Sequence, residues 1–265
     1  MRSICIGVAL SIFVFLAAAA QTPVASNPQA LQILRQSLVA LSPNIAVQDV
    51  TLSGSVHYIA GSDDETGTAT LKGTSQGASR IDLNLGSVQL SEAFNLSTTA
   101  LPSGQWLGPD GTVHQHALHN LFTEAAWFSP GLFLTRVLSA PGMSAVLVGN
   151  ESRDGVAVIH LSVFRQFPNQ SPEMASQLQH LSQIEVYLDQ TTSLPVALTF
   201  NVHPDNDAHL DIPIEIRYSD FQPVPGGKAP FHIEKFINNS LLLDLTIQSA
   251  VVNSGVSAST FPLGQ

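Results

Sequence analysis

Cysteine and basic residues are scarce in this sequence of 265 residues, and charged residues of both signs make up only 11% of it. The one cysteine is Cys5, so a disulfide within the chain cannot support the fold. The 10 basic and 20 acidic residues give a net charge of −10. A surface with this excess of negative charge repels nucleic acid, and we therefore expect no nucleic-acid partner.

Sequence features of common enzyme sites are also few. No cysteine follows residue 20 to act as a nucleophile, and Gly226-Gly227-Lys228 lacks the remainder of a phosphate-binding loop. We therefore expect a protein that is not an enzyme and that has no cofactor. A hydrolase with a site assembled from distant residues is the third alternative, behind two binding functions.

An apolar run opens the sequence. Residues 4–16 are almost wholly apolar, and Ala18 and Ala20 fit the small-residue pattern of a cleavage site. These features predict a signal peptide over residues 1–20, cleaved before Gln21. The run is too short for a comfortable membrane span, and no second run follows. We expect a periplasmic or secreted monomer with no transmembrane segment after cleavage.

The clearest strand pattern lies in residues 212–251, where apolar and polar residues alternate in three stretches. A period of two places one face of each strand in a core. Asn238-Asn239 separates the last two stretches, and both residues tolerate the positive φ of a two-residue hairpin turn. We interpret this antiparallel meander as the end of a larger sheet, which the alternation in residues 47–96 extends.

Helical patterns interrupt the strands at three places. Asn27-Pro28 begins a stretch with leucines on one stripe, and Ser171-Pro172 begins another. Residues 118–138 are predicted to hold two short, unusually apolar helices. Because no linker and no repeat of fixed period is present, we predict one domain over residues 21–265. Its fold class is mainly β (α+β).

Several runs near the C-terminus resemble the LolA-like family, which comprises periplasmic carriers of outer-membrane lipoproteins. Residues 188–195 (LDQTTSLP) resemble the family's unit of a strand, a turn, Leu-Pro and a second strand. Further elements of the resemblance are residues 217–221 (RYSDF), Gly226-Gly227, Pro230 and residues 250–253. The resemblance covers residues 183–261. It implies a strongly curved antiparallel sheet, or incomplete β-barrel, with short helices on its concave side.

The apolar segment 118–138 is the candidate ligand site. A helix that only covered a sheet would need a polar back, whereas apolar residues surround the axis here. We therefore hypothesise a lid over the concave mouth of the half-barrel. The residues predicted to line an apolar pocket are Leu121, Phe122, Phe128, Phe133 and Val137.

Two binding functions fit these features. The first is an exported, non-enzymatic protein that holds an apolar small molecule, a lipid or a lipoprotein acyl chain, and that acts in lipid or lipoprotein transport. The second is an exported interaction or sensor domain on the same fold, with its core filled by its own side chains. The composition, 44% hydrophobic, fits either a large core or extra apolar surface around a cavity.

One histidine cluster is a candidate metal site. His114, His116 and His119 include an H-x-H pair, and three imidazoles can bind zinc. The acidic residues nearby are limited to Asp110 and Glu124. We interpret this cluster as a polar loop beside the start of a helix.

The acidic loop at residues 205–211 partly matches a calcium-binding loop. Leu210 stands where that loop needs a glycine, and Ile216 stands where it needs a glutamate. We interpret this segment as a solvated acidic turn, and we predict no metal in the protein.

Overall fold

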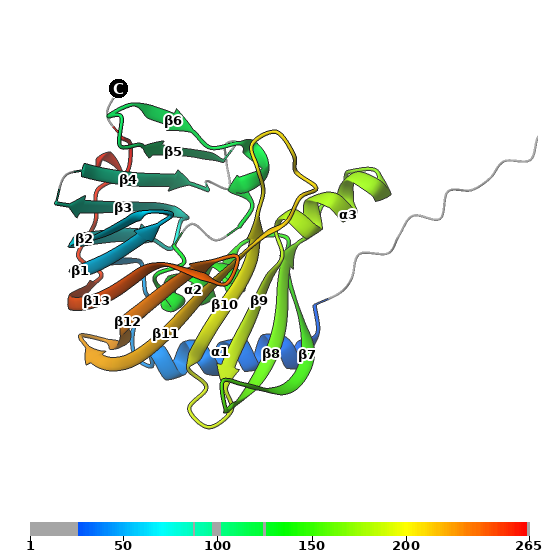
Figure 1. Cartoon of the computed structure of the whole chain (residues 1–265). Helices are drawn as coiled ribbons and strands as arrows, with labels where there is room; N and C mark the ends of the chain where they lie inside the picture. Colours follow the sequence, from blue (N-terminus) through cyan, green and yellow to red (C-terminus); the bar gives the residue numbers. More distant parts are fainter. Residues whose placement is uncertain (1–25, 87, 97–101, 124–125, 264–265) are drawn as a thin grey trace, which may run out of the picture.

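One 13-stranded antiparallel sheet forms the body of the protein (Figure 1). The computed structural model describes residues 26–86, 88–96, 102–123 and 126–263. The predicted signal peptide lies outside the described residues. The strands are β1 (Asp49–Ala60), β2 (Asp63–Thr74), β3 (Ala78–Leu85), β4 (Val88–Asn95), β5 (Ser103–Leu107), β6 (Val113–Gln115), β7 (Met143–Arg153), β8 (Val156–Arg165), β9 (Ile184–Asp189), β10 (Pro195–Val202), β11 (Ile212–Val224), β12 (Gly227–Ile237) and β13 (Ser240–Val252).

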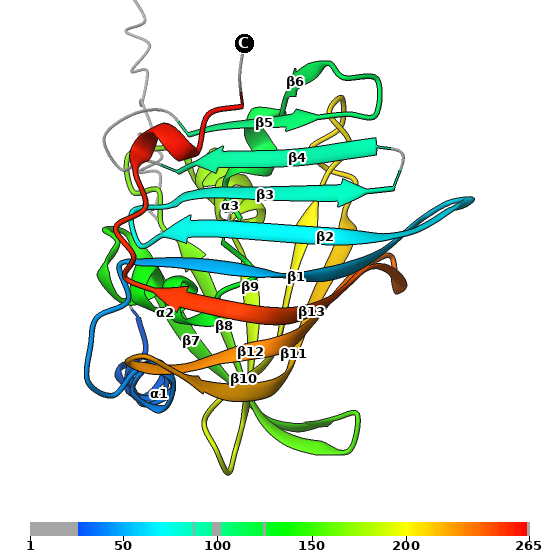
Figure 2. The same ribbon diagram turned by 90° about the vertical axis from the view of Figure 1, so that its left-hand side faces the viewer.

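The order of the strands is β6-β5-β4-β3-β2-β1-β13-β12-β11-β10-β9-β8-β7. Almost every neighbour in the sheet is also a neighbour along the chain. The exception is the antiparallel pairing of β1 with β13, in which Val50 lies opposite Val252 (Figure 2). The predicted meander of β11, β12 and β13 is confirmed, but its predicted place at the end of the sheet is wrong. The β1–β13 and β10–β11 pairings put it in the middle, where the backbone groups on both of its edges form hydrogen bonds with neighbouring strands.

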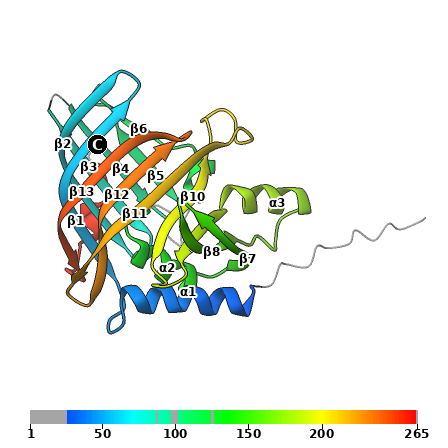
Figure 3. The same cartoon turned by 60° about the horizontal axis from the view of Figure 1, so that its bottom comes forward.

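The sheet is strongly curved and does not close, with β6 and β7 as its two edges (Figure 3). This confirms the predicted half-barrel of mainly antiparallel strands. The helices are α1 (Pro28–Leu41), α2 (Pro130–Ser139) and α3 (Pro172–Leu181), with 3-10 turns η1 (Leu118–Leu121) and η2 (Ala258–Thr260). Helix α2 lies on the concave side, while α1 crosses one end of the strands (Figures 1 and 3). Among the described residues, no helix has the length and apolar character to cross a membrane.

Local sequence signals set the helix starts. The side chain of Asn27 accepts hydrogen bonds from the backbone N–H groups of Gln29 and Ala30, and Ser171 caps α3 in the same way. Two helices were predicted within residues 118–138, and the prediction of the first one is wrong. The described part of that segment forms only the single turn η1. Asn120 bonds to a distant loop at residue 203, which favours a short turn over a continuous helix.

The register of β13 agrees with the alternation in the sequence. Leu243, Leu245 and Ile247 are buried, and Asp244 pairs with His232 on the outer face. Residues 238 and 239 both have positive φ, as the predicted two-residue turn requires.

The segment around α2 packs against β2 on the concave side. Gly73 makes this approach possible, because a Cβ at that position would lie 3.0 Å from the Leu132 side chain and 3.2 Å from the Phe128 ring. Phe128, Phe133 and Leu134 are completely buried there. The Tyr218 hydroxyl on β11 donates a hydrogen bond to the carbonyl of Trp127, which ties the start of this helical segment to the sheet.

Candidate ligand-binding site

Two adjoining cavities lie on the concave side of the sheet, beside the segment that precedes α2. Their volumes are about 330 Å³ and 220 Å³. Taken together, the two cavities lie on the scale of a small-molecule site, for which volumes of roughly 300–1,000 Å³ are typical. The residues that line both cavities are Glu92, His116, Trp127, Lys235 and Leu242. We call the combined space the concave cavity.

The walls of the concave cavity are mostly apolar. Because alternate residues of a strand point to the same face, the buried-face positions of β3, β4, β11 and β13 all contribute. The apolar lining residues are Tyr58, Ile81, Leu83, Leu90, Phe94, Trp106, Leu107, Phe200, Val202, Ile214, Ile237, Leu242 and Leu243. The cavity could therefore receive a hydrophobic chain.

Two charged residues occupy positions that the strand alternation reserves for apolar side chains. Glu92 on β4 lies opposite Ile81 on β3, and Lys235 on β12 lies opposite Leu243 on β13. Both therefore share the concave face with the apolar walls. A charge in such a place is costly unless it is paired, hydrated or bound to a ligand.

Glu92 is held in its charged form by its neighbours. His116 Nε2 lies 3.2 Å from Glu92 Oε1, and the His116 ring stacks on Phe94 with 4.8 Å between the ring centroids. Burial alone would raise the pKa of Glu92. The contact with His116 and the positive charge of Lys235 outweigh burial, and the pKa lies below its usual value of 4.5.

Lys235 and Trp127 form the other polar part of the cavity. The Lys235 ammonium lies 4.8 Å from the centre of the Trp127 ring, within the range of a cation–π interaction. Trp127 is only 3% exposed, and its Nε1–H has no hydrogen-bond partner within the described part of the chain. An unsatisfied buried donor of this kind costs about 1–3 kcal/mol. A ligand oxygen would satisfy it.

The structure divides the five predicted ligand-binding residues between separate environments. Phe128, Phe133 and Val137 belong to the main core, where α2 packs on the sheet. Leu121 joins a small cluster with Leu96 and Phe94, and Phe122 packs edge-on against Phe167. Leu121 and Phe122 therefore lie beside Asn120 and Thr123 of the cavity wall, and the other three form a packed floor. Contact of these five residues with a ligand stays a prediction.

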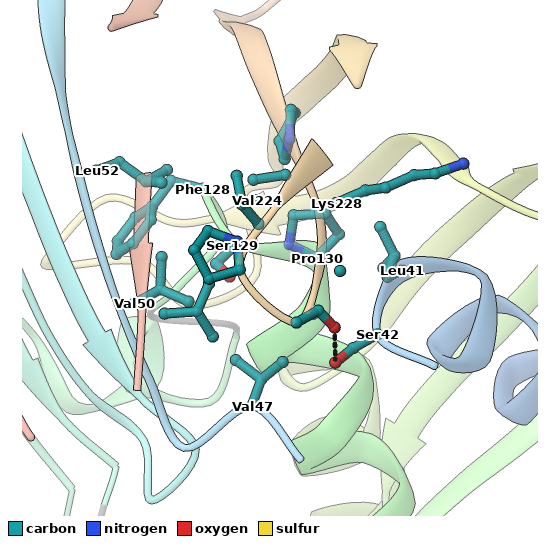
Figure 4. A pocket seen from close by; sticks show the side chains of 17 residues that line it. Leu41, Ser42, Val47, Val50, Leu52, Phe128, Ser129, Pro130, Val224 and Lys228 are labelled. Carbon is teal, nitrogen blue, oxygen red and sulfur yellow. Dashed lines mark hydrogen bonds between the residues drawn. The ribbon is translucent and has the colours of Figure 1, made fainter. Parts of the chain in front are cut away.

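A narrow crevice separates α1 from the start of α2 (Figure 4). It has a volume of about 30 Å³ and is lined by Leu41, Phe128 and Pro130, among others. The Ser42 hydroxyl donates a hydrogen bond to the Gly226 carbonyl at its edge, at 3.3 Å. A space of this size holds about one or two water molecules, so it is not the site of a lipid chain.

The three histidines of the predicted cluster lie in three different environments. His114 stacks on Trp106 and lies 3.6 Å from Asp110, whereas His116 lies in the concave cavity. His119 Nε2 lies 3.0 Å from the carbonyl of Pro204, in the loop between β10 and β11. The fold thus gives each ring its own partner.

Ser75 lies within a short motif that also occurs in hydrolases. Residues 73–77 (GTSQG) have the G-x-S-x-G spacing of a hydrolase nucleophile. In the structure Ser75 lies in the turn between β2 and β3, and its hydroxyl lies 3.3 Å from the side-chain oxygen of Gln48. A nucleophile elbow needs a strand-to-helix turn, so this match does not indicate a hydrolase site.

The sequence held a signal for the charged cavity residues. Lys235 follows Phe231 and Ile233 at the spacing of a buried strand face, and Glu92 stands between Leu90 and Phe94 in the same way. A charge in an apolar series marks a position that solvent, a partner or a ligand must satisfy. Trp127 carries no comparable signal, because only the tertiary structure shows that its donor is unpaired.

Comparison with solved structures identifies the fold. Over 88% of this chain and 96% of the other, it matches an outer-membrane lipoprotein-sorting protein domain from Vibrio parahaemolyticus, with a TM-score of 0.55 and 10% identity. A DUF1329 family protein from Desulfovibrio piger matches over 90% and 98%, with a TM-score of 0.56 and 10% identity. A LolA superfamily protein from Nitrosomonas europaea matches over 88% and 97%, with a TM-score of 0.54 and 11% identity.

These similarities establish a remote LolA-like fold, which the sequence resemblance predicted. No family model matches the sequence, and no curated protein matches it either. At 10–11% identity the likeness concerns the fold, and the site must be argued from its own residues.

Proposed function

We propose that this protein is an exported, non-enzymatic carrier that holds an apolar ligand, such as a lipid or an acyl chain, in the concave cavity. The observation that carries this proposal is the pair of adjoining cavities of about 330 Å³ and 220 Å³ with mostly apolar walls. Removal of an acyl chain from water into such a space is favourable by about 25 cal/mol per Å² of apolar surface. The LolA-like fold, shared with a domain named for lipoprotein sorting, supports the same function.

The polar end of the ligand would lie between Lys235 and Trp127. The Lys235 ammonium can bind an anionic or strongly polar head group, and the free Trp127 Nε1–H can donate to one of its oxygens. Glu92 on β4 lines the same cavity and would repel a second negative charge on the ligand. We therefore propose a ligand with one acidic or polar head and one or more apolar chains.

The five residues predicted as ligand-binding take two roles in this proposal. Phe128, Phe133 and Val137 support the cavity from below as its packed floor. Leu121 and Phe122 lie beside its wall, where a long chain could reach them.

A specific observation favours a second function. Helix α2 already fills part of the concave side, and six of its ten residues are buried. In an interaction or sensor domain, the protein's own side chains would fill the concave side, and a partner would bind on the outer surface. The two functions differ in whether a soluble apolar probe enters the concave cavity.

The test fills the cavity without disturbing the floor. Leu242 lines both parts of the cavity and is only partly buried, so Leu242→Trp should occupy the space where a chain would lie. We expect wild-type protein to bind a fluorescent fatty acid and Leu242→Trp to bind it at least about 10-fold more weakly, a loss of about 1.4 kcal/mol.

The matched control is Val251→Trp, which places the same side chain on the same strand at a position that is 46% exposed. It should bind the probe like wild type. A well-folded wild-type preparation that takes up no apolar probe would refute the carrier function and leave the interaction domain. Export is tested separately, because N-terminal sequencing of the exported protein should begin at Gln21.

A further inference from the structure

Three side chains from distant parts of the chain meet beside the concave cavity. His180 lies in the last turn of α3, His203 follows β10 directly, and Asp211 precedes β11. The Nε2 atoms of His180 and His203 lie 2.9 Å and 3.0 Å from the same oxygen of Asp211, Oδ1. One donor atom from each of the three residues lies within 4.8 Å of the other two.

We infer that His180, His203 and Asp211 form a binding site for a divalent transition-metal ion, with zinc as the best match. Two imidazoles and one carboxylate are a donor set that zinc accepts, with a fourth position left for water or a ligand group. Two donors bound to one tetrahedral zinc ion lie roughly 3.3–3.5 Å apart, given bonds of about 2.0–2.2 Å. To bind one zinc ion, each distance between a histidine Nε2 and Asp211 Oδ1 would have to increase by a few tenths of an ångström. The two imidazole nitrogens would have to move closer together.

The surroundings of the trio hold it in place. The backbone N–H and C=O of His203 both bond to the side chain of Asn120, each at 2.8 Å. The His203 side chain is 1% exposed, whereas those of His180 and Asp211 are 47% and 41% exposed. One ligand is thus fixed in the interior while the other two can adjust to the ion and leave it a path from solvent.

The position of the site suggests what a bound ion would do. Leu181 is the one buried residue of α3, so this helix is held weakly by apolar packing. An ion would tie α3 to the loop between β10 and β11. Because Asn120 bonds to His203 and also lines the 220 Å³ part of the cavity, the ion would fix one rim of the concave cavity. The metal site stands independently of the proposed carrier function.

The sequence does not reveal this site, because its three residues are far apart in the chain. His114, His116 and His119 are close in the chain, and the loop at residues 205–211 matches a calcium-binding loop only in part. The fold instead combines the last residue of that loop with two histidines that lie 31 and 8 positions away.

Calorimetric titration of the chelator-treated full chain with zinc chloride tests this site. We expect one zinc ion per chain, a dissociation constant in the micromolar range or below, and a thermal midpoint that rises with the zinc concentration. Calcium chloride should not bind there, since calcium prefers six to eight oxygen ligands. Cobalt(II) bound in place of zinc should show the visible absorption of a tetrahedral ion.

Two variants locate the binding. His180→Gln and Asp211→Asn change exposed side chains, so both should fold, and each should weaken zinc binding at least about 10-fold. The control is His209→Gln, which removes an 80% exposed histidine from the same loop and should bind zinc like wild type. Absence of zinc binding by wild type, or unchanged affinity in both ligand variants, would overturn the inference.

Discussion

The concave face of the half-barrel has two regions that differ in both packing and charge. Where α2 lies against the sheet, Phe128, Phe133 and Leu134 are completely buried and fill the space. Beside the segment that precedes α2 the face is left partly empty, and there Glu92 and Lys235 replace apolar residues of the strands. We call the first region the floor and keep the name concave cavity for the second.

The difference indicates that the concave cavity is more than a defect of packing. Phe128, Phe133 and Leu134 of the floor belong to the packed apolar core, so a charge at any of these three positions would have no compensation. In the cavity the charges occur where water or a ligand has room to reach them. In the proposed function, the same sheet uses one part of its inner face for stability and the other for binding.

The largest effect should come from an acidic residue placed in the floor, compared with the same residue placed in the concave cavity. Leu134→Asp buries a carboxylate in the floor, where Leu134 has no exposed surface, and it should unfold the protein. Such burial costs several kcal/mol against a total stability of roughly 5–15 kcal/mol. Leu242→Asp places the same group in the cavity and should cost only about 1–2 kcal/mol. Denaturant unfolding measures both, and equal losses would remove the distinction between floor and cavity.

A smaller effect is expected from Phe133→Ala. Phe133 is completely buried in the floor, so the variant should lose about 3–5 kcal/mol of unfolding free energy. If the floor only supports the cavity, binding of a fluorescent fatty acid by the folded variant should change little. A loss of probe affinity without loss of stability would instead show that Phe133 lines the ligand site.

The proposed head-group position predicts a change in selectivity. Lys235→Met keeps the apolar stem and removes the ammonium that lies 4.8 Å from the Trp127 ring. Affinity for a fatty acid should fall about 10-fold, or about 1.4 kcal/mol, while affinity for the alcohol of equal chain length should stay near wild type. Titrations with the two ligands measure the ratio, and an equal change for both would place the head group elsewhere.

The smallest effect concerns the pH dependence of stability. The pKa of Glu92 in the folded protein lies below its usual value, because the neighbouring His116 and Lys235 outweigh burial. A lowered pKa stabilises the folded state above the usual value, and this contribution is lost as the pH falls through the folded pKa. Wild type should therefore lose stability more steeply than Glu92→Gln below about pH 4.5. Parallel curves from urea unfolding would show that the folded environment does not favour the charged form.

Local patterns were sufficient for most of the individual elements. The caps at Asn27 and Ser171, the turn at Asn238-Asn239 and the buried face of β13 all follow from interactions between residues near in sequence. The helix predicted before Ser129 failed because the bonds of Asn120 to residue 203 are long-range. Period and propensity predict the structure of a segment only where no distant partner binds its side chains.

The candidate site was less accessible from sequence. The apolar character of residues 118–138 predicted a segment between two apolar surfaces or against a cavity, but an apolar side chain in a filled floor and one in a cavity wall look alike in sequence. Lys235 and Glu92 were visible as charges in an apolar series, although their common location was not.

The sequence by itself determined most of the strands and their antiparallel pairing with chain neighbours, because alternation and turn chemistry act over a few residues. The curved sheet was implied only by the resemblance to the LolA-like family. Only the tertiary structure decided that β13 pairs with β1, which brings Lys235 and Glu92 to one cavity. It likewise decided that His180 and His203 meet at Asp211. The physical reason is that such contacts depend on how the whole sheet curves, and no short stretch of sequence sets that curvature.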